Sequence, residues 1–79
     1  MRFVIYGRPG CHLCEVMHED LRPLATELGF DIASIDVDSD PQARERYGMR
    51  IPVLVDDEGG EICSTRLEHD AVRRRLAVK

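Results

Sequence analysis

The chain has 79 residues, about half of a typical domain length, so we expect one domain spanning residues 1–79 around a single core. Apolar residues make up 43% of the sequence, which excludes disorder, and a net charge of −4 argues against nucleic acid as the main partner. The apolar run nearest the start has only four residues, too few for a signal segment or a membrane span, so we expect a soluble cytoplasmic protein that binds no membrane.

The sequence opens with a predicted strand followed by an amphipathic helix. β-Branched and aromatic residues predict a strand over 2–6, which ends at a stretch of turn-forming residues. After Cys11 apolar residues recur mostly at three- and four-residue steps until Gly29 supplies a residue suited to the end of a helix. Pro23 lies inside this helix and removes one backbone hydrogen bond, so we expect a bend or a tightened turn near residues 19–23.

The middle of the chain predicts a second strand and a short helix. Residues 30–37 favour a strand whose side chains alternate between two faces. Asp40 followed by Pro41 is an N-cap followed by a proline at the first helical position, and Gly48 closes the segment. The pattern predicts a short helix over 41–47.

The last third predicts a hairpin and a final helix. Strands over 51–55 and 61–64 flank a turn-rich segment and form an antiparallel pair. Thr65 and Glu68 have the spacing of a capping box, which predicts that the final helix starts there. Its core face is marked by Leu67, Ala71, Val72, Leu76 and Val78. The order βαβαββα predicts an α/β sandwich with a four-stranded mixed sheet.

Cys11 and Cys14 are the most informative residues for function. They are three positions apart at the start of the first predicted helix, so their sulfurs can close a small ring and cycle between thiols and a disulfide. At the cap position, unpaired backbone N–H groups and the helix dipole should lower the pKa of the Cys11 thiol and make Cys11 the attacking sulfur. Cys14, one turn further in, should be more shielded and act as the resolving thiol.

Three other roles for the cysteine pair remain open at this stage. The pair could be a structural disulfide, two inert buried thiols, or half of a zinc site. A closed zinc site needs four ligands, and the sequence has no second C-x-x-C pair. The further candidate ligands are Cys63, His12, His18 and His69.

The strand, the C-x-x-C at a helix start and the later Ile51-Pro52 together resemble the thioredoxin superfamily. The segment Tyr6–Cys14, with its C-H-L-C motif, looks most like the small bacterial glutaredoxin-like proteins. The resemblance covers nearly the whole chain. It implies a cis peptide bond before Pro52, and an Ile51 backbone that pairs with an extended substrate segment beside Cys11.

The chain departs from the pattern of glutathione-binding glutaredoxins at two places. Arg50-Ile51-Pro52 stands where those proteins carry Thr-Val-Pro, and Cys63-Ser64-Thr65 stands in the region of their Gly-Gly pair. Arg8 and Arg50 can still pair with a glutathione carboxylate, and His12 can tune the thiolate. The substrate-binding residues implied are Arg8, His12, Arg50, Ile51, Pro52, Ser64 and Thr65.

Taken together, these patterns predict a thiol:disulfide oxidoreductase that carries electrons through Cys11 and Cys14. The resemblance implies no tightly bound cofactor, a disulfide-containing protein or low-molecular-weight thiol as substrate, and either glutathione or a reductase as the electron source. A charged surface without an exposed apolar stripe favours a monomer. Cys63 is expected to be a small buried hydrophobe, with a third redox cysteine as the alternative. The alternative function is a binding module or metal-binding protein that uses the groove at Pro52 to hold a partner or a metal, without turnover.

Overall fold

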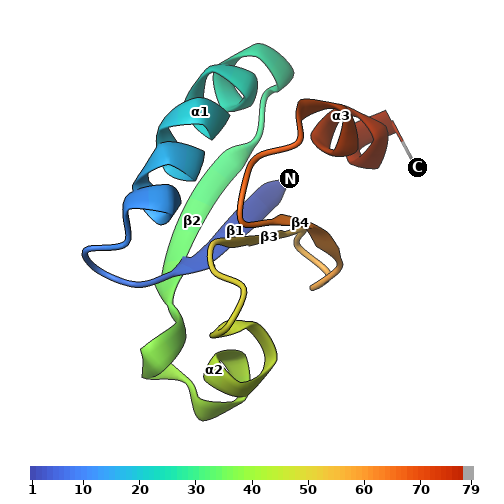
Figure 1. Cartoon of the computed structure of the whole chain (residues 1–79). Coiled ribbons are helices and arrows are strands. Elements are labelled where there is room, and N and C mark those ends of the chain that lie inside the picture. The colour runs from blue at the N-terminus through green and yellow to red at the C-terminus, as the bar shows by residue number, and fades with distance from the viewer. Residues whose placement is uncertain (78–79) are drawn as a thin grey trace.

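The computed structural model describes residues 1–77. Within them, α-helices cover both faces of a four-stranded sheet (Figure 1). The elements are, in chain order, β1 (Arg2–Gly7), α1 (His12–Leu28), β2 (Asp31–Asp36), the 3-10 helix η1 (Val37–Ser39), α2 (Pro41–Tyr47), β3 (Val53–Val55), β4 (Glu61–Ser64) and α3 (His69–Ala77). The predicted α/β fold with a βαβαββα order is confirmed.

The sheet has the strand order β2-β1-β3-β4. β1 pairs in parallel with β2 because α1 carries the chain back across the sheet between them. β3 runs antiparallel to both β1 and β4, and β3 and β4 are joined by a tight hairpin. The sheet is therefore mixed, with β1 in an inner position that leads directly into the first cysteine.

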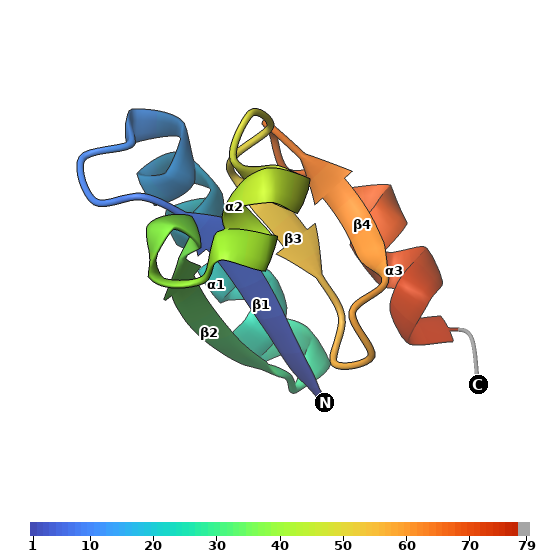
Figure 2. The ribbon, with the colours of Figure 1, turned by 90° about the horizontal axis from the view of Figure 1, so that it is seen from below.

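Helices α1 and α3 cover one face of the sheet and α2 covers the other (Figure 2). Alternation along β1 divides its side chains between the two faces, because successive residues of a strand point in opposite directions. Phe3 and Ile5 join the core under α1 and α3, whereas Val4 and Tyr6 pack toward α2. The Tyr6 and Tyr47 rings lie 4.7 Å apart between their centroids.

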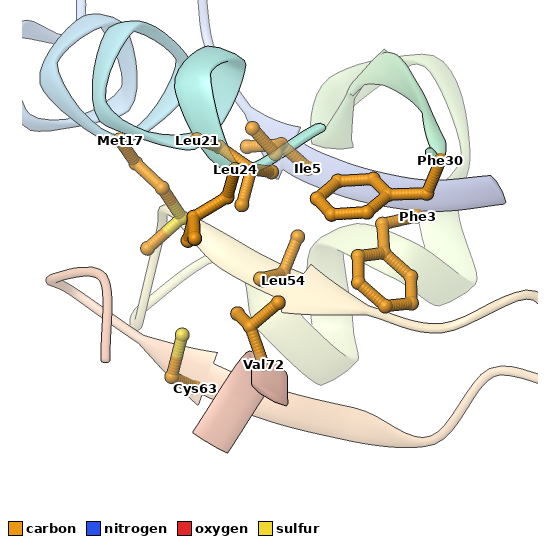
Figure 3. Close-up of a cluster of buried hydrophobic side chains, with 9 residues drawn as sticks. All are labelled: Phe3, Ile5, Met17, Leu21, Leu24, Phe30, Leu54, Cys63 and Val72. Carbon is orange, nitrogen blue, oxygen red and sulfur yellow. The ribbon is translucent and has the colours of Figure 1, made fainter. Parts of the chain in front are cut away.

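The larger core lies under α1 and α3 (Figure 3). It contains Phe3, Ile5, Met17, Leu21, Leu24, Phe30, Leu54, Cys63 and Val72. The α1 members recur at three- and four-residue steps, as the periodicity predicts, and each fully buried apolar side chain contributes about 1.5–3 kcal/mol to folding. The outer face of α1 is charged, and no helix within residues 1–77 is long and apolar enough to cross a membrane.

Two predicted strands are shorter in the structure. β2 ends at Asp36 because the side chain of Asp36 accepts the Asp38 N–H at 2.9 Å and turns the chain into η1, which places Val37 in the core beside α2. β3 begins at Val53, not at residue 51, since Pro52 has no N–H to donate to a strand partner. Pro23 lies exposed within an α1 that is α-helical throughout, so the tightened turn expected there is absent.

The predicted capping box at the last helix is wrong. α3 begins at His69, and the carbonyl of Glu68 accepts the N–H groups of Ala71 and Val72. Thr65 lies outside the helix with φ 72°, because the chain must turn sharply after β4 before it can return over the sheet. Val72 is buried as predicted, whereas Val78 lies outside the described residues.

Candidate active site

Cys11 and Cys14 lie at the start of α1, where the loop after β1 meets the helix. They form a disulfide with a Cα–Cα distance of 5.2 Å, inside the usual range of about 4.4–6.8 Å. The loop is closed by the Cys11 N–H, which donates to the carbonyl of Arg8 at 3.2 Å, and Gly10 supplies the positive φ that this turn needs. The spacing of the pair therefore produces the close contact that the sequence predicts.

Cys11 is the N-cap residue of α1. Its backbone is extended (φ −85°, ψ 110°), and its Sγ accepts the N–H of Cys14 at 3.2 Å. Its carbonyl accepts the N–H of Glu15 at 3.1 Å and so starts the helical hydrogen bonds. The Cys11 sulfur thus lies at the positive end of the helix dipole, where a negative charge on sulfur is stabilised.

The two sulfurs differ in exposure. Cys11 is half-buried, while Cys14 is 9% exposed and packs against β1. The contact depends on Gly7, since a Cβ at that position would lie 2.8 Å from the Cys14 Sγ. In the sequence Gly7 stands in a run of turn-forming residues, and no local pattern signals that a sulfur packs on it.

Pro52 reaches the cysteine end of the sheet through strand pairing. Tyr6 lies opposite Val53, so the residues that follow Tyr6 and those that precede Val53 leave the sheet side by side. The Ile51–Pro52 peptide bond is cis, the isomer that the resemblance implies. Ile51 is half-buried and Pro52 is buried.

Ser64 and Thr65 join Pro52 at the same end of the sheet. Ser64 pairs with Val53, and the Thr65 N–H donates to the Pro52 carbonyl at 2.7 Å. These two residues therefore support the proline from β4. The structure brings together the residues that the sequence placed in the substrate groove, apart from the two arginines and His12, which are described next.

Arg8 is paired with a carboxylate at the surface of the protein. Its Nε donates to Asp38 Oδ2 at 2.9 Å, and a second guanidinium nitrogen donates to the Gly48 carbonyl at 3.3 Å. The hydrogen bond to Asp38 raises the pKa of Arg8 and lowers the pKa of the Asp38 carboxyl group. Arg8 thereby joins the cysteine loop to η1 and α2.

Arg50 is paired in a similar way. Its guanidinium donates to the carboxylate of Glu61 and to the carbonyl of Arg46, and it lies 5.8 Å from the centre of the Tyr47 ring. The hydrogen bond to Glu61 raises the pKa of Arg50. Both guanidinium groups that the sequence offers to a glutathione carboxylate thus have partners within the protein.

Two residues that lie in or next to the site's motifs in the sequence have exposed apolar side chains. Leu13, inside the C-H-L-C motif, is 48% exposed, and Met49, two residues before the cis bond, is 97% exposed. His12 is also exposed. Sequence analysis missed Met49, because an isolated methionine in a loop gives no sign of whether it faces the core or the solvent.

The remaining cysteine, Cys63, lies in the core, and residues 1–77 form no metal site around the pair. Cys63 is 5% exposed in the larger core, and burial raises the pKa of its thiol. This burial supports the interpretation of Cys63 as a small hydrophobe. Within the part of the chain that the structure describes, no three His, Cys, Asp or Glu side chains gather as a metal site, so the zinc set considered above is not assembled.

Comparison with known families identifies the chain's relatives. A family described as "Glutaredoxin-like domain (DUF836)" matches residues 2–77. The chain belongs to this family. A thioredoxin-like fold with a close cysteine pair supports a redox-type function.

Solved structures and curated proteins also resemble the chain. Protein Ne2328 of Nitrosomonas europaea superposes with a TM-score of 0.87 at 36% identity, covering 96% of this chain and 91% of that one. Thioredoxin 1 of Thermosipho africanus, with a TM-score of 0.66 at 20% identity over 99% and 97% of the two chains, shares the fold. An uncharacterized protein of Mycobacterium tuberculosis is 42% identical over 63% of this chain, and the match spans 57% of that protein's length.

Proposed function

We propose that this protein is a thiol:disulfide oxidoreductase that carries electrons through Cys11 and Cys14. The observation that supports the proposal is the disulfide at the N-terminus of α1, with one sulfur half-buried and the other buried. A structural disulfide would normally be shielded on both sulfurs, whereas an exchange reaction needs one reachable sulfur and one held close behind it.

The first step belongs to Cys11. In the reduced protein its thiolate attacks one sulfur of a substrate disulfide, which breaks the substrate S–S bond, forms a mixed disulfide and releases the first substrate thiolate. The N-cap position supports this role because the backbone N–H of Cys14 and the helix dipole stabilise the thiolate. Exposed Leu13 and Met49 provide apolar contact for a substrate at this step.

The second step belongs to Cys14. Its thiol loses a proton, attacks the Cys11 sulfur of the mixed disulfide and releases the second substrate thiolate. The protein is left with the Cys11–Cys14 disulfide, and the substrate has gained two electrons. A dithiol or two thiols from glutathione or a reductase then return the protein to its reduced form.

The substrate we propose is a disulfide in an extended segment of a protein or in a small thiol compound. The Ile51 backbone beside the cis bond offers hydrogen-bonding groups to such a segment, and no tightly bound cofactor is required. Glutathione and a reductase remain the two candidate electron donors. Because Arg8 and Arg50 are already paired, a glutathione carboxylate would have to compete with Asp38 and Glu61.

The deciding experiment compares two serine variants by intact mass after reaction with a disulfide substrate. Cys11→Ser should form no mixed disulfide and show no turnover, whereas Cys14→Ser should accumulate the adduct on Cys11. Equal adduct formation in both variants would contradict the assigned roles. A wild-type pair that fails to cycle in glutathione buffers between roughly −200 and −270 mV would favour the binding module instead.

A further inference from the structure

A cavity of about 300 Å³ lies beside the buried sulfur of the pair. It runs between α1 and the ends of β1 and β2, and its lining includes Cys14, His18, Gly7 and Ser34. Neither Cys11 nor Pro52 lines it, so the cavity is separate from the groove in which a substrate would bind. Gly7 both contacts the Cys14 sulfur and borders the cavity, so the missing side chain at residue 7 helps to leave the space open.

The second step of the proposed reaction places a particular demand on Cys14. An ordinary thiol is only about 3% ionised at pH 7, and the thiolate is the attacking species. Cys14 is 9% exposed, so bulk water has little access to its proton. A proton acceptor inside the protein would therefore speed the attack of Cys14 on the mixed disulfide.

His18 is placed to be that acceptor. It follows Cys14 by four residues on α1, a spacing that puts the two side chains on the same helix face with Cβ atoms about 5–6 Å apart. It is half-buried and lines the same cavity as Cys14. A neutral imidazole takes up a proton in the range of pH in which most cytoplasmic chemistry runs.

The other charged groups at the cavity are less suited to the task. Glu15 of α1 and Asp36 of β2 line the cavity but are exposed, and Asp36 already accepts the N–H of Asp38. Arg8, from the loop after β1, cannot accept a proton and is paired with Asp38. A carboxylate is also a weaker base than an imidazole by about two units, and so is a poorer match to a thiol.

We infer that His18 accepts the proton of the Cys14 thiol across this cavity while Cys14 resolves the mixed disulfide on Cys11. The step balances. The proton moves from Cys14 to the His18 imidazole, the new S–S bond joins Cys14 to Cys11, the mixed disulfide breaks, and the substrate leaves as a thiolate. The inference rests on the proposed function, because it concerns the second of its two steps.

The test is rapid mixing of the fully reduced protein with 5,5′-dithiobis(2-nitrobenzoate), which releases one coloured thiolate at each step. The first phase reports Cys11 and the second phase reports Cys14. His18→Gln should leave the first phase unchanged and slow the second at least tenfold at pH 7. The second phase should also rise more steeply with pH in His18→Gln than in the wild type, because only solvent is left to take the thiol proton in the variant.

Three further variants make the result specific. His69→Gln, an exposed histidine at the start of α3, is the matched control and should change neither phase. Added imidazole should restore the second phase in His18→Ala, because the shortened side chain enlarges the existing cavity. Glu15→Gln should have little effect, and a loss of the second phase in this variant with a normal His18→Gln would assign the proton to Glu15 and overturn the inference.

The inference and the proposed function fail in different ways. If wild-type protein released no second thiolate, the two-step reaction itself would be wrong. If both phases were present, and His18→Gln kept the wild-type rate and pH profile of the second, only the role of His18 would be wrong. An unchanged first phase in His18→Gln also shows that the variant is folded around its cysteine loop.

Discussion

The two ends of the sheet differ in how they hold a reactive or charged group. At one end, β1 and β3 lead into the cysteine loop and the cis bond. At the other end lies the hairpin between β3 and β4 (Figure 2). This hairpin contains Asp56, which is 3% exposed. Each end contains a group that is chemically unusual for a small domain, either a reactive sulfur or a buried carboxylate. At the hairpin end, both oxygens of the buried carboxylate accept hydrogen bonds. At the cysteine end, the sulfur of Cys11 is only half-buried.

The Asp56 carboxylate is bound by backbone N–H groups and by an arginine. Its carboxylate accepts the N–H groups of Glu58 at 2.9 Å and Gly60 at 2.8 Å and is also bound by Arg75 of α3. Burial alone raises the pKa of Asp56, but the hydrogen bonds from Gly60, Arg75 and Glu58 outweigh it and hold the pKa below its usual range. A buried charge whose two oxygens both accept hydrogen bonds is a structural feature, and a perturbed pKa by itself does not mark an active site.

The first prediction concerns the loss of the buried carboxylate at the hairpin end. Asp56→Ala should lower the free energy of unfolding by about 3 kcal/mol, because two part-buried N–H groups and the Arg75 guanidinium lose their acceptor. The rate of disulfide exchange at 25 °C should stay unchanged while the protein is folded. Urea unfolding monitored by circular dichroism gives the first quantity, and Asp57→Ala, an exposed neighbour, should shift it by no more than about 0.5 kcal/mol.

The second prediction concerns the packing of the buried sulfur. Gly7→Ala places a Cβ 2.8 Å from the Cys14 Sγ, and relieving that overlap should cost about 1–3 kcal/mol of stability. It should also slow the second step of exchange by moving Cys14. Gly10→Ala is the control, because its φ of 79° makes the substitution unfavourable although nothing lies within 4 Å of the new Cβ. Equal exchange rates in both variants would contradict a role for Gly7 in placing Cys14.

The third prediction concerns the loss of stability in acid, which should come mainly from the hairpin end. The pKa of Asp56 is lowered in the folded state, so its contribution to stability is complete above the unfolded value of about 3.9 and is lost as the pH falls through the folded value. Wild-type stability should therefore drop below pH 4, and Asp56→Asn should flatten that drop. Urea midpoints between pH 7 and pH 3 measure the effect. Asp38→Asn, at an exposed ion pair with Arg8, should flatten it less.

The smallest effect is expected at Thr65, on the cysteine side of β4. Its φ of 72° is unfavourable for a β-branched residue by about 1–2 kcal/mol, and glycine would relieve this strain. Glycine would also cost about 0.5–1 kcal/mol, because it loses more backbone entropy on folding. Thr65→Gly should therefore stabilise the protein by less than about 1 kcal/mol. Ser64→Gly, in the extended strand next to it, should destabilise, and a loss of stability in both would contradict the argument from backbone strain.

Sequence patterns predicted the helices, strands and caps better than the contacts between residues far apart in the chain. The three- and four-residue periodicity of α1, the N-cap role of Asp40 and the C-x-x-C pair all depend on residues within about one helical turn, and all are present in the structure. The carboxylate partners of Arg8 and Arg50 lie 30 and 11 residues away, and no local pattern identifies them. The start of α3 was mispredicted for the same reason, since Thr65 is bound to Pro52 and not to its own helix.

By itself, the sequence determined which segments become helices and strands and that two cysteines meet at the start of a helix. These features follow from side-chain periodicity and from backbone hydrogen bonds between near neighbours. Only the tertiary structure decided that Gly7 packs on the Cys14 sulfur, that His18 shares a cavity with Cys14, and that Asp38 and Glu61 pair with Arg8 and Arg50. The physical reason is that strand register and helix packing join residues far apart in the chain, and exposure is set by what those distant residues cover.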